Sequence, residues 1–378
     1  MTQRTYAAGW MAAARIQAHF TRRLSALAPQ EGGAAPAPDA ACVEAMLEAA
    51  FWASLRREEG KLPRISLAYV APDALRWPVK FERPLPLAAQ PLARLAPAVE
   101  RPGIHLGVWR ESGHLGVWGA THELPAFSFV LEVVGPGLMV VKLSRADESG
   151  KFVNAAVLQG DEIKLIDEDA ARLLDCPDLL NSLLGLATRR ASAEDINVLI
   201  QLAVSMRAHG HGGSLLVVPS KTETWRESVV QPIMYALAPP FSALSELLQE
   251  RTRKDPHPRW ISALGRAVDE IAGLTAVDGA TVITDHYEVL AFGAKIVRRR
   301  QCPPVTEVII TEPIEGARPE VAEPAQLGGT RHLSAAQFVH DQRDALALVA
   351  SQDGRFTVFA WSSCENMVHA HRIDTLLM

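Results

Sequence analysis

The stretch Ile-Ala-Gly-Leu-Thr-Ala-Val-Asp-Gly-Ala-Thr-Val-Ile-Thr, residues 271–284, places the end of a helical pattern just before a β-rich run. Residues 259–272 predict a helix, and Thr281–Thr284 predicts a buried strand because the run is short and β-branched. The dipeptide Asp278-Gly279 between them is typical of a turn. A helix that leads through a turn into a buried strand indicates a sheet covered by helices, so this stretch predicts an α/β fold.

The residues on either side of this stretch continue the alternation of strands and helices. A glycine turn and the apolar strand Leu215–Val218 precede it, followed by a long segment that prolines interrupt up to about residue 258. The elements expected downstream are strands at Val289–Ala294, Glu307–Thr311, Leu346–Ser351 and Arg355–Phe359, and a helix at 331–343. We therefore expect a C-terminal mixed-sheet α/β sandwich.

The first sixty residues predict two helices. Residues 5–28 form one helical pattern and residues 39–58 form a second, whose start Asp39 can cap. The glycine- and proline-rich run at 32–38 separates them, because proline removes backbone donors and glycine costs conformational entropy in a helix. We expect the second helix to pack against a core.

Short β-rich runs fill residues 64–166, and glycine-containing turns separate several of them. The tetrapeptide Leu-Gly-Val-Trp occurs there twice, at 106–109 and 115–118. We interpret the two copies as the arms of one hairpin, since one short duplication does not establish a repeat architecture. The region predicts a small α+β domain built of hairpins.

A chain of 378 residues is too long for one ordinary domain and fits two. Two further helical stretches, at about 168–185 and 192–208, are expected to connect the domains. The sequence thus predicts a smaller α+β domain over residues 1–185 and the α/β domain over residues 186–378.

Composition restricts the classes of partner. The net charge is −5 and no basic block occurs, so we do not expect nucleic acid to be the main ligand. The sequence shows no export signal and no run of about 20 apolar residues, which predicts a soluble, cytoplasmic protein without a membrane partner. The four cysteines lie far apart, which argues against a zinc site or a disulfide framework.

The first motif that could bind a ligand is Val277-Asp278-Gly279-Ala280, at the entry to a predicted strand. Small residues allow a ligand to approach the backbone closely. A carboxylate beside them can hold Mg²⁺ or Mn²⁺ against a triphosphate.

Gly328-Gly329-Thr330-Arg331-His332, immediately before a predicted helix, is the second motif. The start of a helix offers unpaired N–H groups and a positive dipole end to phosphate, and Thr330 could cap that start. Arg331 adds a planar guanidinium that suits phosphate oxygens.

Each motif alone also fits a purely structural role. An isolated Asp-Gly-Ala is most often a structural turn. The pairs His209-x-His211 and His369-x-His371 lack a visible third metal ligand and fit flexible or surface histidines. The glycines at 210–213 lack the Lys-Ser/Thr of a P-loop and fit a turn into a strand.

Taken together and in this order, the two motifs resemble those of the diadenylate cyclase family. In that family an Asp-Gly-Ala motif follows a helix, a Gly-Thr-Arg-His-Arg motif opens a later helix, and a Ser-Glu pair ends the following strand. The resemblance covers about 150 residues, from about His209 to Trp361, and includes the Gly-Gly-Ser-Leu-Leu-Val-Val strand.

The resemblance implies that two ATP molecules are joined into cyclic di-AMP with release of pyrophosphate, each ATP held by one protomer of a homo-oligomer whose nucleotide sites face each other. Asp278 would bind Mg²⁺ or Mn²⁺ and help prepare the ribose 3′-hydroxyl for attack. The residues that would contact the nucleotide or its phosphates are Gly279, Ala280, Gly329, Thr330, Arg331, His332 and Ser351. The family pairs its catalytic domain with varied regulatory domains, which implies a sensor role for residues 1–185.

The chain departs from the family pattern at Leu333, where the family has a second arginine, and at Gln352, where it has a glutamate. Asp353 or Asp285 could compensate for the lost carboxylate. Three hypotheses remain: a diadenylate cyclase, a catalytically degenerate receptor for ATP or a cyclic dinucleotide, and a structural protein in which both motifs are coincidences.

Overall fold

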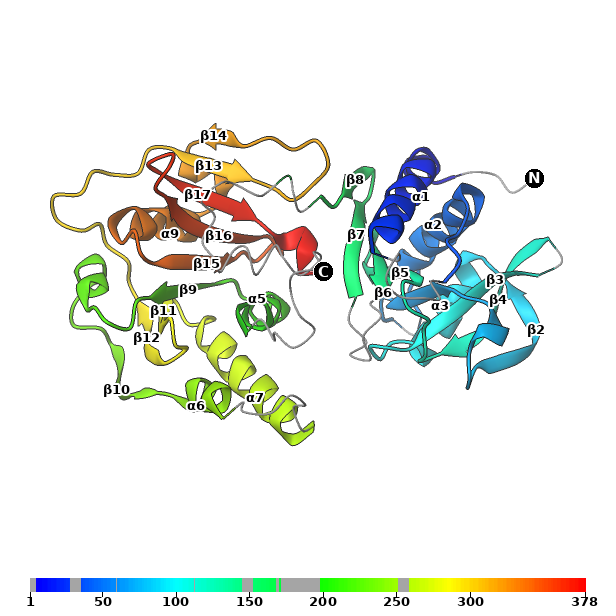
Figure 1. Cartoon of the computed structure of the whole chain (residues 1–378), viewed down its shortest axis with the longest axis horizontal. Coiled ribbons are helices and arrows are strands. Elements are labelled where there is room, and N and C mark those ends of the chain that lie inside the picture. Colours follow the sequence, from blue (N-terminus) through cyan, green and yellow to red (C-terminus); the bar gives the residue numbers. More distant parts are fainter. Residues whose placement is uncertain are drawn as a thin grey trace. The chain divides into compact units, whose positions relative to one another are not determined.

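The computed structural model describes residues 5–27, 35–58, 60–111, 113–144, 152–167, 170, 198–250 and 258–378. The chain divides into two compact units, one that reaches Ile166 and one from Asp167 to Leu377. Each unit contains a mixed sheet and helices, so the predicted α/β class is confirmed (Figure 1). The boundary predicted at 185 falls outside the described residues and stays a prediction.

The N-terminal unit begins with two helices, as predicted. Asp39 caps the second helix, because its side chain accepts a hydrogen bond of 2.7 Å from the backbone N–H of Cys42. The helices of this unit are α1 (Ala7–Leu27), α2 (Ala40–Ser54) and α3 (Ala89–Leu95), with the 3₁₀ turns η2 (Pro72–Ala74) and η3 (Ala96–Ala98).

In the described ranges, eight strands form the N-terminal sheet in the order β2-β4-β3-β1-β5-β6-β7-β8. The strands are β1 (Ile65–Tyr69), β2 (Val79–Pro86), β3 (His105–Glu111), β4 (His114–Thr121), β5 (Phe129–Gly135), β6 (Leu138–Ser144), β7 (Phe152–Gln159) and β8 (Glu162–Leu165). The hairpin predicted from the repeated tetrapeptide is confirmed, since β3 and β4 pair antiparallel with Val108 opposite Val117. Only β1 and β3 pair in parallel among the described strands of this sheet.

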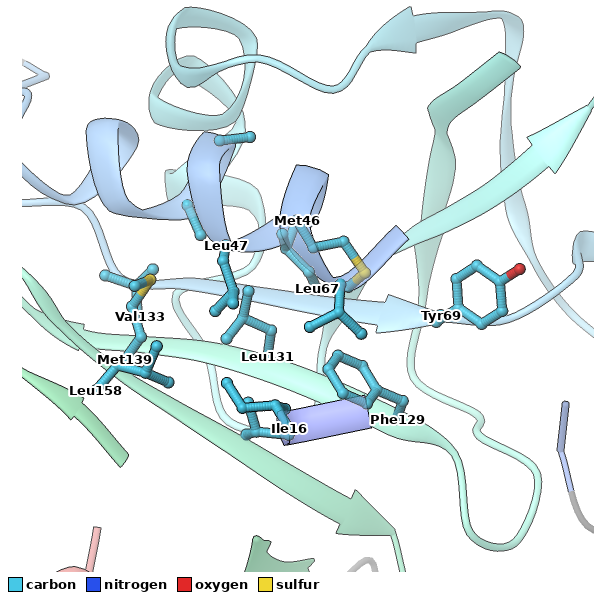
Figure 2. Packing of buried hydrophobic residues seen from close by; sticks show 14 of the residues in the cluster. Ile16, Met46, Leu47, Leu67, Tyr69, Phe129, Leu131, Val133, Met139 and Leu158 are labelled. Atoms are coloured by element: carbon cyan, nitrogen blue, oxygen red, sulfur yellow. The ribbon is translucent and has the colours of Figure 1, made fainter. Parts of the chain in front are cut away.

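One face of this sheet packs against α1 and α2. Figure 2 shows Ile16 from α1 and Met46 and Leu47 from α2 over Leu67 and Leu131 of the sheet. All five side chains are fully buried. Because side chains alternate between the faces of a strand, the neighbours of Leu67 and Leu131 lie on the opposite face.

Nine strands of the described part of the chain form the C-terminal sheet in the order β10-β12-β11-β9-β15-β16-β17-β13-β14. The strands are β9 (Gly213–Val218), β10 (Tyr235–Phe241), β11 (Ala280–Thr284), β12 (Val289–Ala294), β13 (Val308–Thr311), β14 (Glu320–Ala322), β15 (Leu346–Ala350), β16 (Phe356–Ser362) and β17 (Met367–Arg372). The strands predicted near 281, 289, 307, 346 and 355 are all present within one or a few residues.

Helices pack on both faces of the C-terminal sheet. Leu202 of α5 and Ile271 of α7 pack with Leu215 on one face, whereas Phe338 of α9 packs with Leu216 on the other. The helices are α5 (Val198–Ala208), α6 (Ala243–Gln249), α7 (Pro258–Leu274), α8 (Pro324–Leu327) and α9 (Thr330–Asp341), with η6 (Thr224–Ser228) and η7 (Asp374–Leu376). The arrangement is a layered α/β unit. No helix in the described ranges is long and apolar enough to cross a bilayer.

The interpretation of His369 and His371 as flexible or surface residues is wrong. Both lie in β17 and are at most 2% exposed, and Nδ1 of His371 is 2.7 Å from the hydroxyl of Thr311 on β13. β17 pairs with β16 on one side and with β13 on the other, so its side chains are covered. We did not predict this strand because the two histidines of Met-Val-His-Ala-His-Arg interrupt the apolar pattern of a buried strand.

Candidate functional site

Four strands of the C-terminal sheet have neighbouring ends at the edge beside the first motif. β9 and β11 are parallel, with Ser214 beside Ala280. Two antiparallel neighbours place Ala350, the end of β15, beside Gly213, and Ala294, the end of β12, beside Ala280. We call the line of residues Gly213, Ala280, Ala294 and Ala350 the site edge. The loops that continue from these residues therefore lie together.

Asp278 lies two residues before β11 and is almost fully exposed, at 90% for its side chain. Its carboxylate forms an ion pair with Lys295, which follows β12 at the same edge. The hydrogen bond from Lys295 and its charge lower the pKa of Asp278, and Arg331 lowers it further. The carboxylate is thus ionised at neutral pH and accessible to a ligand.

The start of α9 faces the same edge without a side-chain cap. Gly329 is the N-cap residue, and Thr330 is the first helical residue rather than the cap, so the predicted capping role of Thr330 is wrong. A Cβ atom at Gly329 would have no heavy atom within 4 Å, which leaves open space in front of the helix. The first N–H groups of this 12-residue helix therefore receive no side-chain acceptor from the capping position.

Arg331 reaches from α9 to the loop before β9. A Cβ atom on Gly212 would lie 3.1 Å from Nη1 of Arg331, 3.2 Å from the carbonyl oxygen of Ala350 and 3.3 Å from Cγ of Gln352. Gly212 also has a φ of +70°, which favours glycine. The glycine thus lets the guanidinium approach the site edge closely.

His332 is buried beneath the start of α9, at 2% exposure. Its ring packs edge-on against Phe359, and a Cβ atom on Gly328 would lie 2.6 Å from Nδ1. Burial lowers the pKa of His332, so the ring is neutral at neutral pH. This position suits packing of the ring against the Gly328 loop better than direct contact with phosphate. The predicted contact of His332 with phosphate stays a prediction.

The remaining predicted site residues are Gly279, Ala280 and Ser351, and they contribute mainly backbone atoms to the edge. Gly279 has a φ of +119°, and a Cβ atom there would lie 2.4 Å from the carbonyl carbon of Gly293, so the close packing of two strands requires this glycine. Ala280 is buried in the core. Ser351 opens a tight turn, donating its N–H to Arg355 at 2.9 Å.

Of the two carboxylates expected to compensate for Gln352, only Asp353 lies at this edge. Asp285 follows the other end of β11, about 15–20 Å away at the usual rise of a strand, and accepts a hydrogen bond from the N–H of Ser220. Burial raises the pKa of Asp353, but hydrogen bonds from Ser351 and the N–H of Arg355 outweigh it and lower the pKa. Asp285 cannot serve the site in this structure.

Lys295 and Gly212 are members of the site that the sequence analysis missed. Lys295 directly follows a strand that returns antiparallel to the Asp278 turn, which is the signal that could have identified it. Gly212 was interpreted only as a turn, because nothing in the local sequence indicates the approach of Arg331.

The side chains at this edge fit a metal ion only together with a nucleotide. No group of three or more His, Cys, Asp and Glu side chains that could hold a metal occurs in the parts of the chain that the structure describes. Mg²⁺ is usually bound through one or two carboxylates together with substrate phosphates. The single exposed carboxylate of Asp278 fits that mode.

Comparison with known proteins gives one family match, to the N-terminal unit. Residues 33–122 match the model of the family described as "Probable sensor domain DACNV". No curated protein matches the chain. A solved structure titled "hypothetical membrane spanning protein from Bacillus cereus" is 16% identical, with a TM-score of 0.26, over 51% of this chain and 71% of that chain, and this likeness carries no argument. The part of the chain from residue 33 to residue 122 is therefore similar to a family of probable sensor domains.

Proposed function

We propose that the chain is a diadenylate cyclase that condenses two ATP molecules into cyclic di-AMP and pyrophosphate. The observation that supports this function is the sheet register, which brings Asp278 and Lys295 together at the edge where Arg331 of the uncapped helix α9 approaches Gly212. A carboxylate, two cations and free N–H groups are what a nucleotide triphosphate with its metal requires.

The proposed roles follow from the chemistry of each group. Arg331 and the first N–H groups of α9 bind phosphate oxygens, and Lys295 moves from Asp278 to the phosphates when ATP enters. Asp278 accepts the hydrogen bond of the ribose 3′-hydroxyl and orients it for attack. A bound Mg²⁺ or Mn²⁺ would neutralise phosphate charge. Phosphoryl transfer of this kind depends on positioning and charge, and it needs no covalent nucleophile.

Two further parts of the proposal concern the rest of the molecule. Because each site holds one ATP, condensation requires two protomers whose site edges face each other. The match of residues 33–122 to a probable sensor domain supports control of the reaction by the N-terminal unit.

A second candidate is a receptor that binds ATP or a cyclic dinucleotide without turnover. Gln352 favours it, because its Nε2 donates a hydrogen bond of 3.3 Å to the carbonyl oxygen of His211. A glutamate at this position could not donate that bond. Gln352 thus holds the glycine loop, rather than supplying a charged ligand.

Incubation of the purified chain with ATP and Mg²⁺ or Mn²⁺, followed by mass spectrometry of the products, tests the proposal. Formation of cyclic di-AMP and pyrophosphate in a 1:2 ratio supports the cyclase. Saturable ATP binding with no product at high protein concentration supports the receptor instead. Absence of both would overturn the assignment of the site edge to nucleotide binding.

A further inference from the structure

A row of polar side chains crosses the N-terminal sheet on the face opposite α1 and α2. Ser66 on β1 pairs directly with Glu132 on β5. Their neighbours Leu67 and Leu131 belong to the core beneath the helices, so alternation places Ser66 and Glu132 on the other face. Polar side chains in the middle of a sheet require hydrogen-bond or charge partners, because burial of an unpaired polar group is costly.

His105 on β3 and Lys142 on β6 extend this row to four adjacent strands. His105 Nδ1 lies 2.7 Å from the hydroxyl oxygen of Ser66, and Lys142 forms an ion pair with Glu132. We call Ser66, His105, Glu132 and Lys142 the polar row.

The polar row lines a cavity of about 350 Å³. Its size lies at the small end of the range of about 300–1,000 Å³ that is typical of small-molecule sites. Val130, Val134 and Phe152 supply apolar side chains on the same face, and Arg64, Glu100, Arg101 and Met378 also line the cavity. An apolar wall with a few convergent polar groups is the usual composition of a ligand pocket.

His105 lies in the wall of this cavity. The residue is only 4% exposed, its Nδ1 is engaged with Ser66, and its ring packs edge-on against Phe152. Burial lowers the pKa of His105 to about 4, so the ring is neutral at physiological pH. When the Ser66 hydroxyl donates to Nδ1, Nε2 carries the proton and can donate to an acceptor in the cavity.

The ion pair of the polar row restricts which kind of ligand fits beside it. The side chain of Lys142 is 14% exposed and that of Glu132 is 37% exposed, so both charges are partly desolvated. Each charge is therefore stabilised by its partner, and loss of one partner would leave the other unpaired. A simple anion that took Lys142 would leave Glu132 without its partner. A molecule with one negative and one positive group can insert between them and keep both charges paired.

We propose that this cavity binds a small zwitterion of amino-acid size. Its carboxylate accepts hydrogen bonds from Lys142 and from His105 Nε2, its ammonium group donates to Glu132, and its side chain packs against Val130 and Phe152. The binding itself does not depend on the activity of the C-terminal unit, whereas its interpretation as the signal for the sensor rests on the proposed function.

Thermal unfolding of the full chain with each of the twenty standard L-amino acids, in the absence of ATP, is the first measurement. For each stabilising amino acid, calorimetry compares the amino acid with its analogue that lacks the amine and with its analogue that lacks the carboxylate. We expect the complete amino acid to bind at least tenfold more tightly than either analogue, because each lost charge-assisted hydrogen bond corresponds to about a 10- to 100-fold change.

Paired variants locate the binding. Glu132→Gln and Lys142→Met should each weaken binding at least tenfold. The matched controls Glu162→Gln and Lys164→Met alter an ion pair of the same type on β8 that does not line the cavity, and they should leave binding unchanged.

Three results would overturn the proposal: no amino acid stabilises the chain, an analogue with one charge binds as tightly as the zwitterion, or the β8 controls weaken binding as much as the cavity variants. The comparison of analogues uses the unaltered protein, so it holds even if a variant fails to fold. Because ATP is absent, none of these results depends on whether cyclic di-AMP is formed.

Discussion

Lys295 Nζ lies 2.5 Å from Oδ2 of Asp278, although the two residues are separated by 17 positions in the chain. The antiparallel pairing of β11 and β12 creates this contact at the site edge. An exposed pair of this kind adds little stability by itself. It keeps a cation and an ionised carboxylate together at the edge where we place the nucleotide.

Lys295→Met should raise the pKa of Asp278 toward its ordinary value, because the hydrogen bond and the charge that lower it are lost. ATP binding without metal should weaken about tenfold, the loss of one charge-assisted contact. NMR titration of the carboxyl carbon and calorimetry measure the two effects. Lys221→Met, beyond the opposite end of β9, is the control and should change neither.

Asp278→Asn should abolish formation of cyclic di-AMP and leave the fold intact, since the side chain is exposed and packs against no core. The matched control is Asp285→Asn at the opposite end of β11, which should retain full turnover. Product formation and circular dichroism are measured on both variants. Near-normal turnover by Asp278→Asn would show that another group holds the metal.

Arg331→Ala should weaken the binding of ATP about 10- to 100-fold and leave the binding of adenosine nearly unchanged, because its expected partner is phosphate. Arg343→Ala is the control, since Arg343 follows the far end of α9 and lies over the ring of Trp361 at 4.0 Å. Calorimetry with both ligands decides the matter. Equal losses for ATP and adenosine would remove the phosphate role.

Leu333→Arg restores the arginine of the family pattern. Leu333 is 43% exposed on the first turns of α9, so the new charge would not be buried, and stability should change by less than about 1 kcal/mol. In a slow cyclase, turnover with ATP and Mn²⁺ should rise by up to about 100-fold. Leu333→Met is the uncharged control. A stable Leu333→Arg protein that forms no product would favour the receptor.

The neutral, buried His105 should make the stability of the N-terminal unit depend on pH. Its folded pKa of about 4 is below the ordinary 6.5, so the unfolded chain binds the proton more readily. Stability from this group is complete above about pH 6.5 and falls, by up to roughly 3 kcal/mol, as the pH drops toward 4. Urea unfolding between pH 4 and 7.5 should show a smaller decrease for His105→Gln. Equal pH dependence of the two proteins would contradict the assignment.

Strong local patterns predicted most of the fold. The helix before Asp278, the strand after it and the cap at Asp39 follow from periodicity and capping chemistry that act within a few residues. β2 and β10 were missed because they are outermost strands of their sheets, largely exposed and containing prolines. Edge strands tolerate proline and need no continuous apolar pattern.

The candidate site was predictable only in part. Asp278 and Arg331 belong to short motifs, whereas the approach of Arg331 to Gly212 depends on the pairing of β9 with β15. The misplacement of Asp285 has a different origin, because the predicted strand Thr281–Thr284 already separates it from Asp278 and could have excluded it. Long-range register is the information that a single sequence lacks.

The hydrogen bond from Gln352 to His211 joins residues that are 141 positions apart. His211 and Gln352 flank Gly213 and Ala350, which pair between β9 and β15, so this contact requires that these two strands have paired. Closing so long a segment costs conformational entropy, which the pairing must offset. If ATP binds at this edge as we propose, it binds only the C-terminal unit in which β9 and β15 are paired. Its occupancy would then stabilise that unit against unfolding, to an extent that grows with ligand concentration.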